Sequence, residues 1–544
     1  MSSLTVPFMM PSVEEVVPDF VMLKDRLTGS SVVEERYTST QVPSSGDTYS
    51  VGGTGSKLMI IRVSNQNDYI DTSTMCLNFK ATAANSLANV AIDDHIFSCV
   101  DTINVKVGGQ TVEVLNNVGH LVNALVQGSM PSSYYSRSGQ FEGLYVYDKT
   151  ASAAGPGASL SSDAILPFFV GATSGASVIT QLPDLTAGSA PKTTGSSQLQ
   201  SKWQVGSRWL STGRYYSVPL TMLGICRLPT LFAARNFQDI TIEILFRSGL
   251  AGAVWQLDPT AAVETTVATG SIAITDVTLT YDCCRMSADY YALMDNELKM
   301  PNGSGVAYPI DTYQVQAAGI ASSGLGATAH TALTTPALTR IVVAKGTRFL
   351  KGVYGTTKVA ASESSPKYRN NSTSGNFAFN SYQVIINSKR YPQLQIQSTA
   401  QAYQELQKAY NLLGSVAGGS QISWYNYCGH PFKRNLAAGT GIGSRQDLAV
   451  GSTKDGTTLG MYEGDEAMFQ LGVNLEQFLS SAPDAGGINT STSGYQIAVE
   501  LGQLAAASAD GVAATVAGAN LTHYVMLHFT RILTLKAGAV EILD

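Results

Sequence analysis

Charged side chains are scarce in this sequence, which limits what the protein can bind. They make up 14% of the 544 residues, whereas an average soluble domain has roughly 25%. The net charge is −6 and the basic residues are scattered; we interpret the densest pairs, Lys389-Arg390 and Lys433-Arg434, as solvated loop charges. A basic face that binds nucleic acid by releasing counterions is therefore not expected.

Cysteine is also rare. The chain has no C-x-x-C motif, and its cysteines are Cys76, Cys99, Cys226, Cys283, Cys284 and Cys428. A disulfide framework is not expected, and a reducing compartment is the simplest interpretation. Most of these residues lie in apolar or strand-like runs, where cysteine acts as a small hydrophobic residue. We expect Cys283 and Cys284 to fill a core at the end of a strand.

Long apolar runs are missing as well. No stretch of about 18 uninterrupted apolar residues occurs, so no transmembrane helix is predicted. The first 20 residues have neither a basic start nor a clean apolar segment, and they do not resemble a secretion signal.

Sequence signatures of catalysis are nearly absent. The chain has no G-x-S-x-G, G-x-G-x-x-G, Walker A or H-E-x-x-H motif. The adjacent acidic pairs Glu14-Glu15, Glu34-Glu35 and Asp465-Glu466 cannot face each other across a cleft, as a glycosidase requires. We therefore predict that the protein is not an enzyme and has no catalytic, cofactor-binding or metal-binding residues.

The histidines do not suggest a metal site. They are scattered along the chain at His95, His120, His330, His430, His523 and His528. We expect His120 to be a packing or surface residue of a helix. His523 and His528 are five residues apart on a predicted strand and should face opposite sides. In "WYNYCGHPFKRN", Trp424 to Asn435, a Cys428–His430 nucleophile is weighed against a packed loop anchor, which we favour.

Small polar residues and 51 glycines take the place of the missing charges. Such a surface suits either a protein that is covered by partners or a β-rich protein with long polar loops. The length favours two or more domains, since single cores rarely grow beyond about 300 residues.

One local pattern occurs twice. In "DTINVKVGGQTVEVLNNVGHLVNALVQG", two alternating runs flank Gly108-Gly109, which predicts a hairpin. Asn116-Asn117 should then cap a helix whose apolar face begins at Val118. The same order of hairpin and helix returns in "NSYQVIINSKRYPQLQIQSTAQAYQELQKAYNLLG", with its turn at Asn387-Ser388 and a C-cap at Gly414.

Predicted strands surround both hairpins in the same order. The first half offers "KLMIIRVS", "MCLNFKAT", "GRYYSVPLTML", "DITIEILF" and "SIAITDVTLTYDCC". A short helix in "MSADYYALMDNELKMPNG" follows. The second half offers "DTYQVQAAG", "ALTRIVVAKG", "FLKGVYGTT", "AMFQLGVNLEQF", "GYQIAVEL" and "THYVMLHFTRILTLKAG". The hairpins lie about 280 residues apart and the late strands about 250 to 255, which indicates a duplicated unit.

We predict an all-β chain of two consecutive eight-stranded jelly-roll sandwiches, with a short helix after each hairpin and long loop insertions. The expected divisions are an arm without sheet structure at 1–50, a first jelly roll at 51–298 with a long loop near 129–202, and a second at 299–544 with a long loop near 415–464.

The chain resembles the double jelly-roll major capsid proteins of icosahedral double-stranded DNA viruses, the lineage of nucleocytoplasmic large DNA viruses, virophages and polinton-like viruses. The resemblance covers residues 50–544 and rests on the order of these patterns. The segments that carry it are "INVKVGGQTVEVLNNVGHLVNAL", "YYSVPLTMLGICRLPTLFAARNFQDITIEILFRS", "ITDVTLTYDCCRMSADYYALM" and "NSYQVIINSKRYPQLQI".

The resemblance implies a homotrimer with six jelly rolls, which forms a pseudo-hexagonal tile of a capsid in the virion. The long loops would contact neighbours or form the outer face. The arm would lie on the inner face and anchor capsomers to each other, to penton or minor proteins, or to an internal membrane. The alternative is a duplicated β-sandwich lectin or adhesin, which would usually carry a secretion signal.

Overall fold

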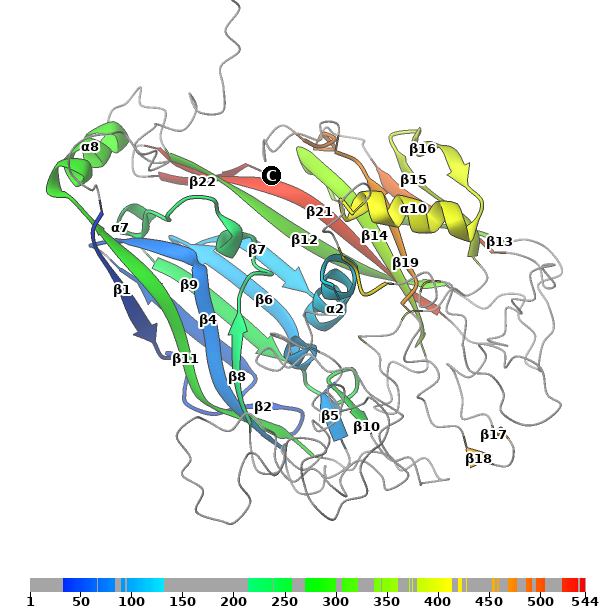
Figure 1. Ribbon diagram of the computed structural model, residues 1–544, viewed down its shortest axis with the longest axis horizontal. Coiled ribbons are helices and arrows are strands. Elements are labelled where there is room, and N and C mark those ends of the chain that lie inside the picture. The colour runs from blue at the N-terminus through cyan, green and yellow to red at the C-terminus, as the bar shows by residue number, and fades with distance from the viewer. Residues whose placement is uncertain are drawn as a thin grey trace, which may run out of the picture.

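The computed structural model forms two β-sandwiches that follow each other along the chain and lie side by side (Figure 1). The residues that the structure describes are 33–65, 67–83, 90–92, 95–131, 214–237, 239–256, 270–299, 306–320, 337–343, 345–360, 371, 374, 379–412, 419–422, 427, 453–454, 457–458, 468–476, 486–491, 496–503, 521–536 and 539–543.

The first sandwich has two antiparallel sheets. One has the order β1 (Val33–Gln41), β11 (Ile272–Met286), β4 (Tyr69–Ala83) and β8 (Arg214–Pro219), with β2 (Tyr49–Val51) also paired to β11. The other has the order β3 (Leu58–Ser64), β9 (Asp239–Phe246), β6 (Val100–Val107) and β7 (Gln110–Asn116).

The second sandwich repeats this plan. One sheet has the order β12 (Val306–Ile320), β21 (Leu521–Lys536), β14 (Phe349–Val359) and β19 (Gln470–Asn474), with β22 (Ala539–Leu543) added on β21. The other has the order β13 (Ala337–Val343), β20 (Ile497–Gln503), β15 (Phe379–Ile386) and β16 (Lys389–Ile396).

The strand orders of the two sandwiches are the same. When the eight strands are lettered B to I along the chain, with β1 and β2 together as B, each sandwich has one sheet B-I-D-G and one sheet C-H-E-F. This is the connectivity of a jelly roll. The predicted all-β double jelly roll is confirmed.

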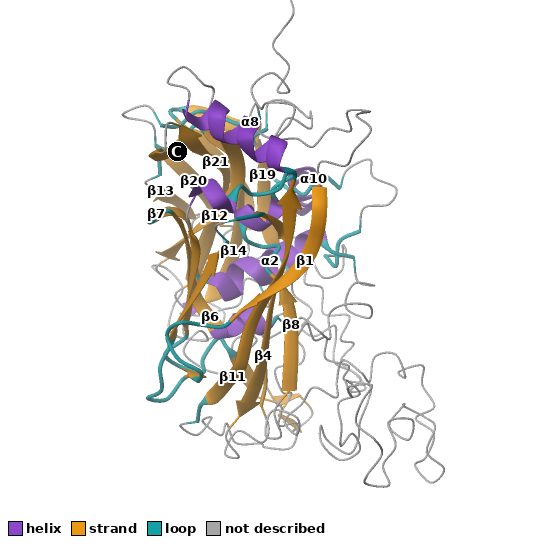
Figure 2. Ribbon diagram, turned by 90° about the vertical axis from the view of Figure 1, so that its left-hand side faces the viewer, coloured by secondary structure: helices purple, strands orange, loops and turns teal. Residues whose placement is uncertain are grey.

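Smaller elements lie between these strands. They are β5 (Val90–Ile92), η2 (Ile96–Cys99), η5 (Gly224–Arg227), α7 (Ala234–Phe237), β10 (Val254–Gln256), α8 (Ala288–Lys299), β17 (Thr453–Lys454) and β18 (Thr457–Thr458). The helix α8 connects β11 to β12, where the sequence predicted a short helix. It lies near one end of the molecule, above the end of β1 (Figure 2). The boundary at 298 stays a prediction.

Both predicted hairpins form. Gly108 and Gly109 have φ of 55° and 81°, and Asn387 and Ser388 have φ of 46° and 67°. Positive φ at both central residues is the geometry of a type I′ turn, which matches the twist of the flanking strands. The predicted helices follow as α2 (Val118–Ser129) and α10 (Thr399–Ala409).

The helix caps differ from the expectation. Asn117 occupies the N-cap of α2, but its backbone is left-handed and its side chain makes no capping hydrogen bond. Capping residues normally have an extended backbone, which directs the side chain toward the first turn. Ser398 has that conformation and caps α10 by accepting a hydrogen bond from the backbone N of Gln401 at 3.2 Å. Gly414 lies outside the described residues.

Part of the expected arm belongs to the first sandwich. The expectation that residues 1–50 form no sheet is wrong for β1, which pairs with β11 from Val33 opposite Met286 to Gln41 opposite Leu279. Its sequence VEERYTSTQ gave little signal, because Tyr37 is its only aromatic side chain. Most of the two predicted long loops lies outside the described residues.

Candidate functional site

Several of the described residues that could carry chemistry serve packing instead. His120 of α2 is buried, and its ring stacks on Tyr524 of β21 with 4.1 Å between ring centroids. Burial lowers the pKa of His120, so its imidazole is neutral. This is the packing role expected from the sequence.

His523 and His528 face opposite sides of β21, as predicted. His523 lies among the core residues of the second sandwich, and its Nδ1 is 2.8 Å from Oγ1 of Thr357. Burial lowers the pKa of His523 to about 4. His528 stacks on Tyr313, and burial lowers its pKa to about 3. Within the described ranges, no three His, Cys, Asp or Glu residues are placed to hold a metal ion.

Cys283 and Cys284 are both buried, as expected. Cys283 Sγ accepts a hydrogen bond from Asn65 Nδ2 at 3.1 Å. Burial raises the pKa of both thiols, which keeps them protonated and unreactive. No disulfide joins the cysteines that the structure describes, which are Cys76, Cys99, Cys226, Cys283 and Cys284.

Several sequence candidates cannot be placed. Cys428 and His430, with most of the segment from Trp424 to Asn435, lie outside the described residues. The same holds for His330 and for the Asp465-Glu466 pair. Tyr427 of that segment is described, and it is fully buried against Phe469 with ring centroids 4.9 Å apart. Among the described helices, none is long and apolar enough to cross a membrane.

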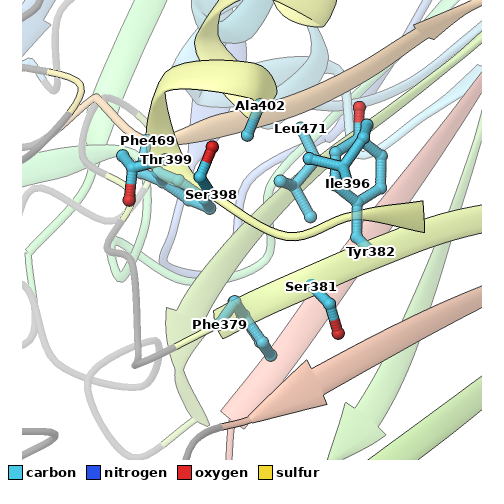
Figure 3. Close-up of a pocket in the computed structure, with 9 residues that line it drawn as sticks. All are labelled: Phe379, Ser381, Tyr382, Ile396, Ser398, Thr399, Ala402, Phe469 and Leu471. Carbon is cyan, nitrogen blue, oxygen red and sulfur yellow. The ribbon is translucent and has the colours of Figure 1, made fainter. Parts of the chain in front are cut away.

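A small hollow lies between α10, β15 and β19 (Figure 3). Its lining residues are Phe379, Ser381, Tyr382, Ile396, Ser398, Thr399, Ala402, Phe469 and Leu471. Its volume is about 10 Å³, close to the space that one water molecule needs. Ligand sites usually enclose roughly 300–1,000 Å³, so this hollow is too small to enclose a sugar or a cofactor.

The candidate site is the interface between the two sandwiches. The outer face of the β12-β21-β14-β19 sheet packs against β7, α2 and η5 of the first sandwich. Figure 1 shows α2 between the two sandwiches. The core of the first sandwich continues into this contact through Tyr308, Ile310, Tyr313, Tyr524, Met526 and other second-sandwich residues.

Strand β21 is buried on both faces. Tyr524 and Met526 join the core of the first sandwich, whereas Val525 and Leu527 join the core of the second. A strand that is buried on both faces needs apolar residues at nearly every position. The unbroken run "YVML" in β21 meets that need.

A carboxylate lies at the centre of the interface. Glu113 of β7 is fully buried, and Oε1 accepts a hydrogen bond from Thr312 Oγ1 of β12 at 2.7 Å. Its two carboxylate oxygens also lie 3.1 Å and 3.0 Å from the backbone N of Gly224. Burial raises the pKa of Glu113, against these hydrogen bonds and the nearby Arg227 and Arg531.

Gly224 allows this close approach. A Cβ at this position would lie 2.2 Å from the backbone O of Asp311 on β12. Only glycine can therefore place the η5 backbone against β12 without a shift. The guanidinium of the neighbouring Arg227 donates to the same carbonyl oxygen of Asp311 at 2.6 Å.

An ion pair supports β12 from its own sheet. Lys351 Nζ lies 2.7 Å from Oδ1 of Asp311, which also accepts a hydrogen bond from Thr530 Oγ1 at 2.5 Å. Burial opposes ionisation of Asp311, but the nearby His528 and Lys351 and these hydrogen bonds hold its pKa below the usual range. Asp311 is therefore an anion at neutral pH.

The other end of the interface involves α2. The backbone O of Ala124 accepts hydrogen bonds from Gln470 Nε2 at 3.2 Å and from Tyr410 Oη at 3.3 Å. The backbone O of Gln127 accepts one from the N of Gln421 at 3.0 Å. Continuous apolar packing, with hydrogen bonds at both ends, makes this a fixed interface rather than a hinge.

The sequence did not reveal Glu113. The alternation predicted that Val112 and Val114 share the buried face, but Val114 is only half-buried while Glu113 and Leu115 are fully buried. The register of β6 and β7 shifts between Val105 and Lys106, which redirects the side chains of β7. The only sign of a buried acidic residue in the sequence was a glutamate between two valines.

No family model and no curated protein sequence matches the chain. Solved structures with a similar fold include the Sputnik virophage determined by cryo-EM, with 11% identity, coverage of 95% of this chain and 90% of that chain, and a TM-score of 0.49. The mavirus major capsid protein has 8% identity, coverage of 100% and 95%, and a TM-score of 0.49. The Faustovirus major capsid protein has 8% identity, coverage of 92% and 90%, and a TM-score of 0.47.

Proposed function

We propose that this chain is the major capsid protein of an icosahedral double-stranded DNA virus. In this proposal, three copies form a pseudo-hexagonal capsomer, and many capsomers form the shell of the virion. The observation that carries the proposal is the fixed interface between two jelly rolls of equal strand order, to which each contributes a different surface.

The interface is of the head-to-tail kind. The second sandwich contributes the outer face of its B-I-D-G sheet, whereas the first contributes strand F, helix α2 and η5. Head-to-tail contacts build rings when the rotation between units closes. Three chains with two sandwiches each would supply the six similar units of a closed ring.

The composition supports a structural role. A shell subunit buries much of its lateral surface, and unpaired buried charges are costly. A charged fraction of 14% agrees with such burial. The described residues also hold no group of three or more His, Cys, Asp or Glu side chains placed to bind a metal ion.

The finer roles follow the resemblance described from the sequence. The protein acts as a structural component rather than an enzyme. The residues before β1 would anchor capsomers to each other, to minor or penton proteins, or to an internal membrane. The segments near 129–202 and 415–464 would contact neighbouring capsomers or form the outer face.

Light scattering of the purified protein tests the proposal. A stable species near 172 kDa, three times the 57.5 kDa chain, is expected, with a pseudo-hexagonal outline in negative-stain images. A protein that stays monomeric at high concentration would contradict the proposal. A glycan-binding assay would then test the lectin alternative.

A further inference from the structure

We infer that strand β16, with Leu394 at its exposed edge, is the surface on which strand β1 of a second copy of this chain docks. This inference rests on the proposed function and assigns the residues of the contact between chains.

The first step is that β7 and β16 occupy equivalent places. In the first sandwich Ile103 pairs with Leu115, and in the second Tyr382 pairs with Ile396. Helix α2 begins three residues after Leu115, and helix α10 begins three residues after Ile396. Strand β16 therefore holds the place of β7, and Leu394 lies within it, where the register between β15 and β16 shifts.

The two equivalent strands differ sharply in burial. Glu113 is 0% exposed because β12 of the second sandwich covers it. Leu394 is 86% exposed and is the most exposed large apolar side chain among the described residues. A leucine gains stability when it leaves water, so the second sandwich presents an uncovered apolar residue on the strand whose counterpart in the first sandwich is covered.

The covering strand has an equivalent as well. Strand β12 is the edge strand B of its sheet, and β1 holds the same place in the first sandwich, next to β11. On β1 the outward-facing Arg36, Thr38 and Thr40 are exposed. A second copy can therefore place β1 over β16 as β12 lies over β7.

The direction of the contact follows from the internal interface. Arg531, which pairs with Ile310, donates to the backbone O of Val112, and Thr312 donates to Glu113. Strands β12 and β7 therefore run in the same direction across the interface. The start of β1 should accordingly lie near the start of β16, beside its hairpin turn.

The charges at these two starts are complementary. Glu34 is exposed at the start of β1, and Lys389 and Arg390 are exposed at the start of β16. The adjacent Glu35 already pairs with Arg285 of its own chain at 2.9 Å. Docking in the inferred direction brings Glu34 to this basic pair. Opposite charges across an interface favour encounter and fix the register.

The test compares two leucines on opposite edges of one sheet. Leu394→Asp should place a charge in the contact and weaken trimers at least about tenfold, measured by sedimentation across a dilution series. Leu338→Asp is the matched control, because Leu338 is 64% exposed on β13 at the other edge. Circular dichroism and thermal unfolding of both variants check that they are folded.

A charge exchange tests the direction. The variant Glu34→Lys should weaken the trimer, and adding Lys389→Glu with Arg390→Glu should restore it. A photo-crosslinking residue at position 394, in mixed light and heavy isotope-labelled chains, should link to β1 of a different chain.

The outcomes distinguish a failure of the assigned contact from a failure of the proposed function. A folded Leu394→Asp variant that trimerises as well as the wild type, or crosslinks from position 394 to a surface other than β1, would overturn the assigned contact and leave the proposed function standing. A wild-type protein that never trimerises would overturn both. Loss of the trimer in Leu394→Asp but not in Leu338→Asp, with rescue by charge exchange, supports the inference.

Discussion

Glu113 accepts a hydrogen bond from Thr312 across the boundary between the two sandwiches, with 2.7 Å between Oε1 and Oγ1. Both residues are buried, so water cannot replace the bond if it is lost. The relative placement of the two jelly rolls therefore depends on polar complementarity as well as on apolar contact.

The first prediction concerns this bond. Thr312→Val keeps the side-chain shape but removes the donor, and it should lower the free energy of unfolding by about 1–3 kcal/mol, because a buried carboxylate loses a partner. Urea unfolding followed by tryptophan fluorescence measures the loss. Thr111→Val is the control, since Thr111 is exposed on the same strand as Glu113 and should change stability by less than about 0.5 kcal/mol.

The second prediction concerns the close approach at Gly224. Gly224→Ala would place a Cβ 2.2 Å from the backbone O of Asp311 and should destabilise the protein by about 1–3 kcal/mol or more. Gly249→Ala is the matched control, because a Cβ at Gly249 would meet no atom within 4 Å. Equal melting temperatures for the two variants would show that the interface adjusts freely.

The third prediction concerns pH. Burial lowers the pKa of His523 to about 4, below its ordinary value near 6.5, so the folded state favours the neutral ring. The stabilisation is complete above about pH 6.5 and is lost as pH falls toward 4, by about 3 kcal/mol in total.

A variant isolates this contribution. His523→Gln cannot take up the proton, so its stability should change less between pH 7 and pH 4.5 than that of the wild type, even if it is less stable at pH 7. Urea unfolding at the two pH values gives the comparison. Parallel losses in the two proteins would contradict a role for His523.

The fourth prediction concerns the attachment of β1. Tyr37 Oη donates to the buried Asp68 at 2.5 Å, and a hydrogen bond to a charged group contributes about 1.5–3 kcal/mol. Tyr37→Phe should therefore speed amide hydrogen exchange in residues 33–41. Tyr215→Phe serves as the control, because Tyr215 is 60% exposed and donates to Asp276, which is also exposed. Slow exchange in β1 of Tyr37→Phe would argue against this anchor.

Local elements could be predicted from the sequence where one short signal decides them. Gly108-Gly109 and Asn387-Ser388 each lie between alternating runs, and both hairpins formed. Because the same signals occur in both halves of the chain, the duplication could also be predicted. Strand β1 was missed because VEERYTSTQ has few apolar residues and is held through Tyr37 and through hydrogen bonds of Arg36 and Thr38 to Asp282.

The interface between the sandwiches could not be predicted in the same way. Its polar centre depends on a change of register between Val105 and Lys106 and on contacts between residues about 200 positions apart, such as Glu113 and Thr312. Neither leaves a local pattern. The apolar run in β21 was visible, but a strand buried between two sheets and one buried within a single sandwich have the same composition.

The two-sided burial of β21 bears on how the chain folds during synthesis. Chains emerge from the ribosome with the N-terminal domain first, so β7, α2 and η5 can be in place before β21 is translated. The aromatic face formed by Tyr308, Tyr313 and Tyr524 then packs against a first sandwich that has already folded in the same chain. An isolated second jelly roll would expose that face and would be prone to aggregate. In the full chain the first jelly roll is made earlier, so it can cover this face as soon as the second one folds.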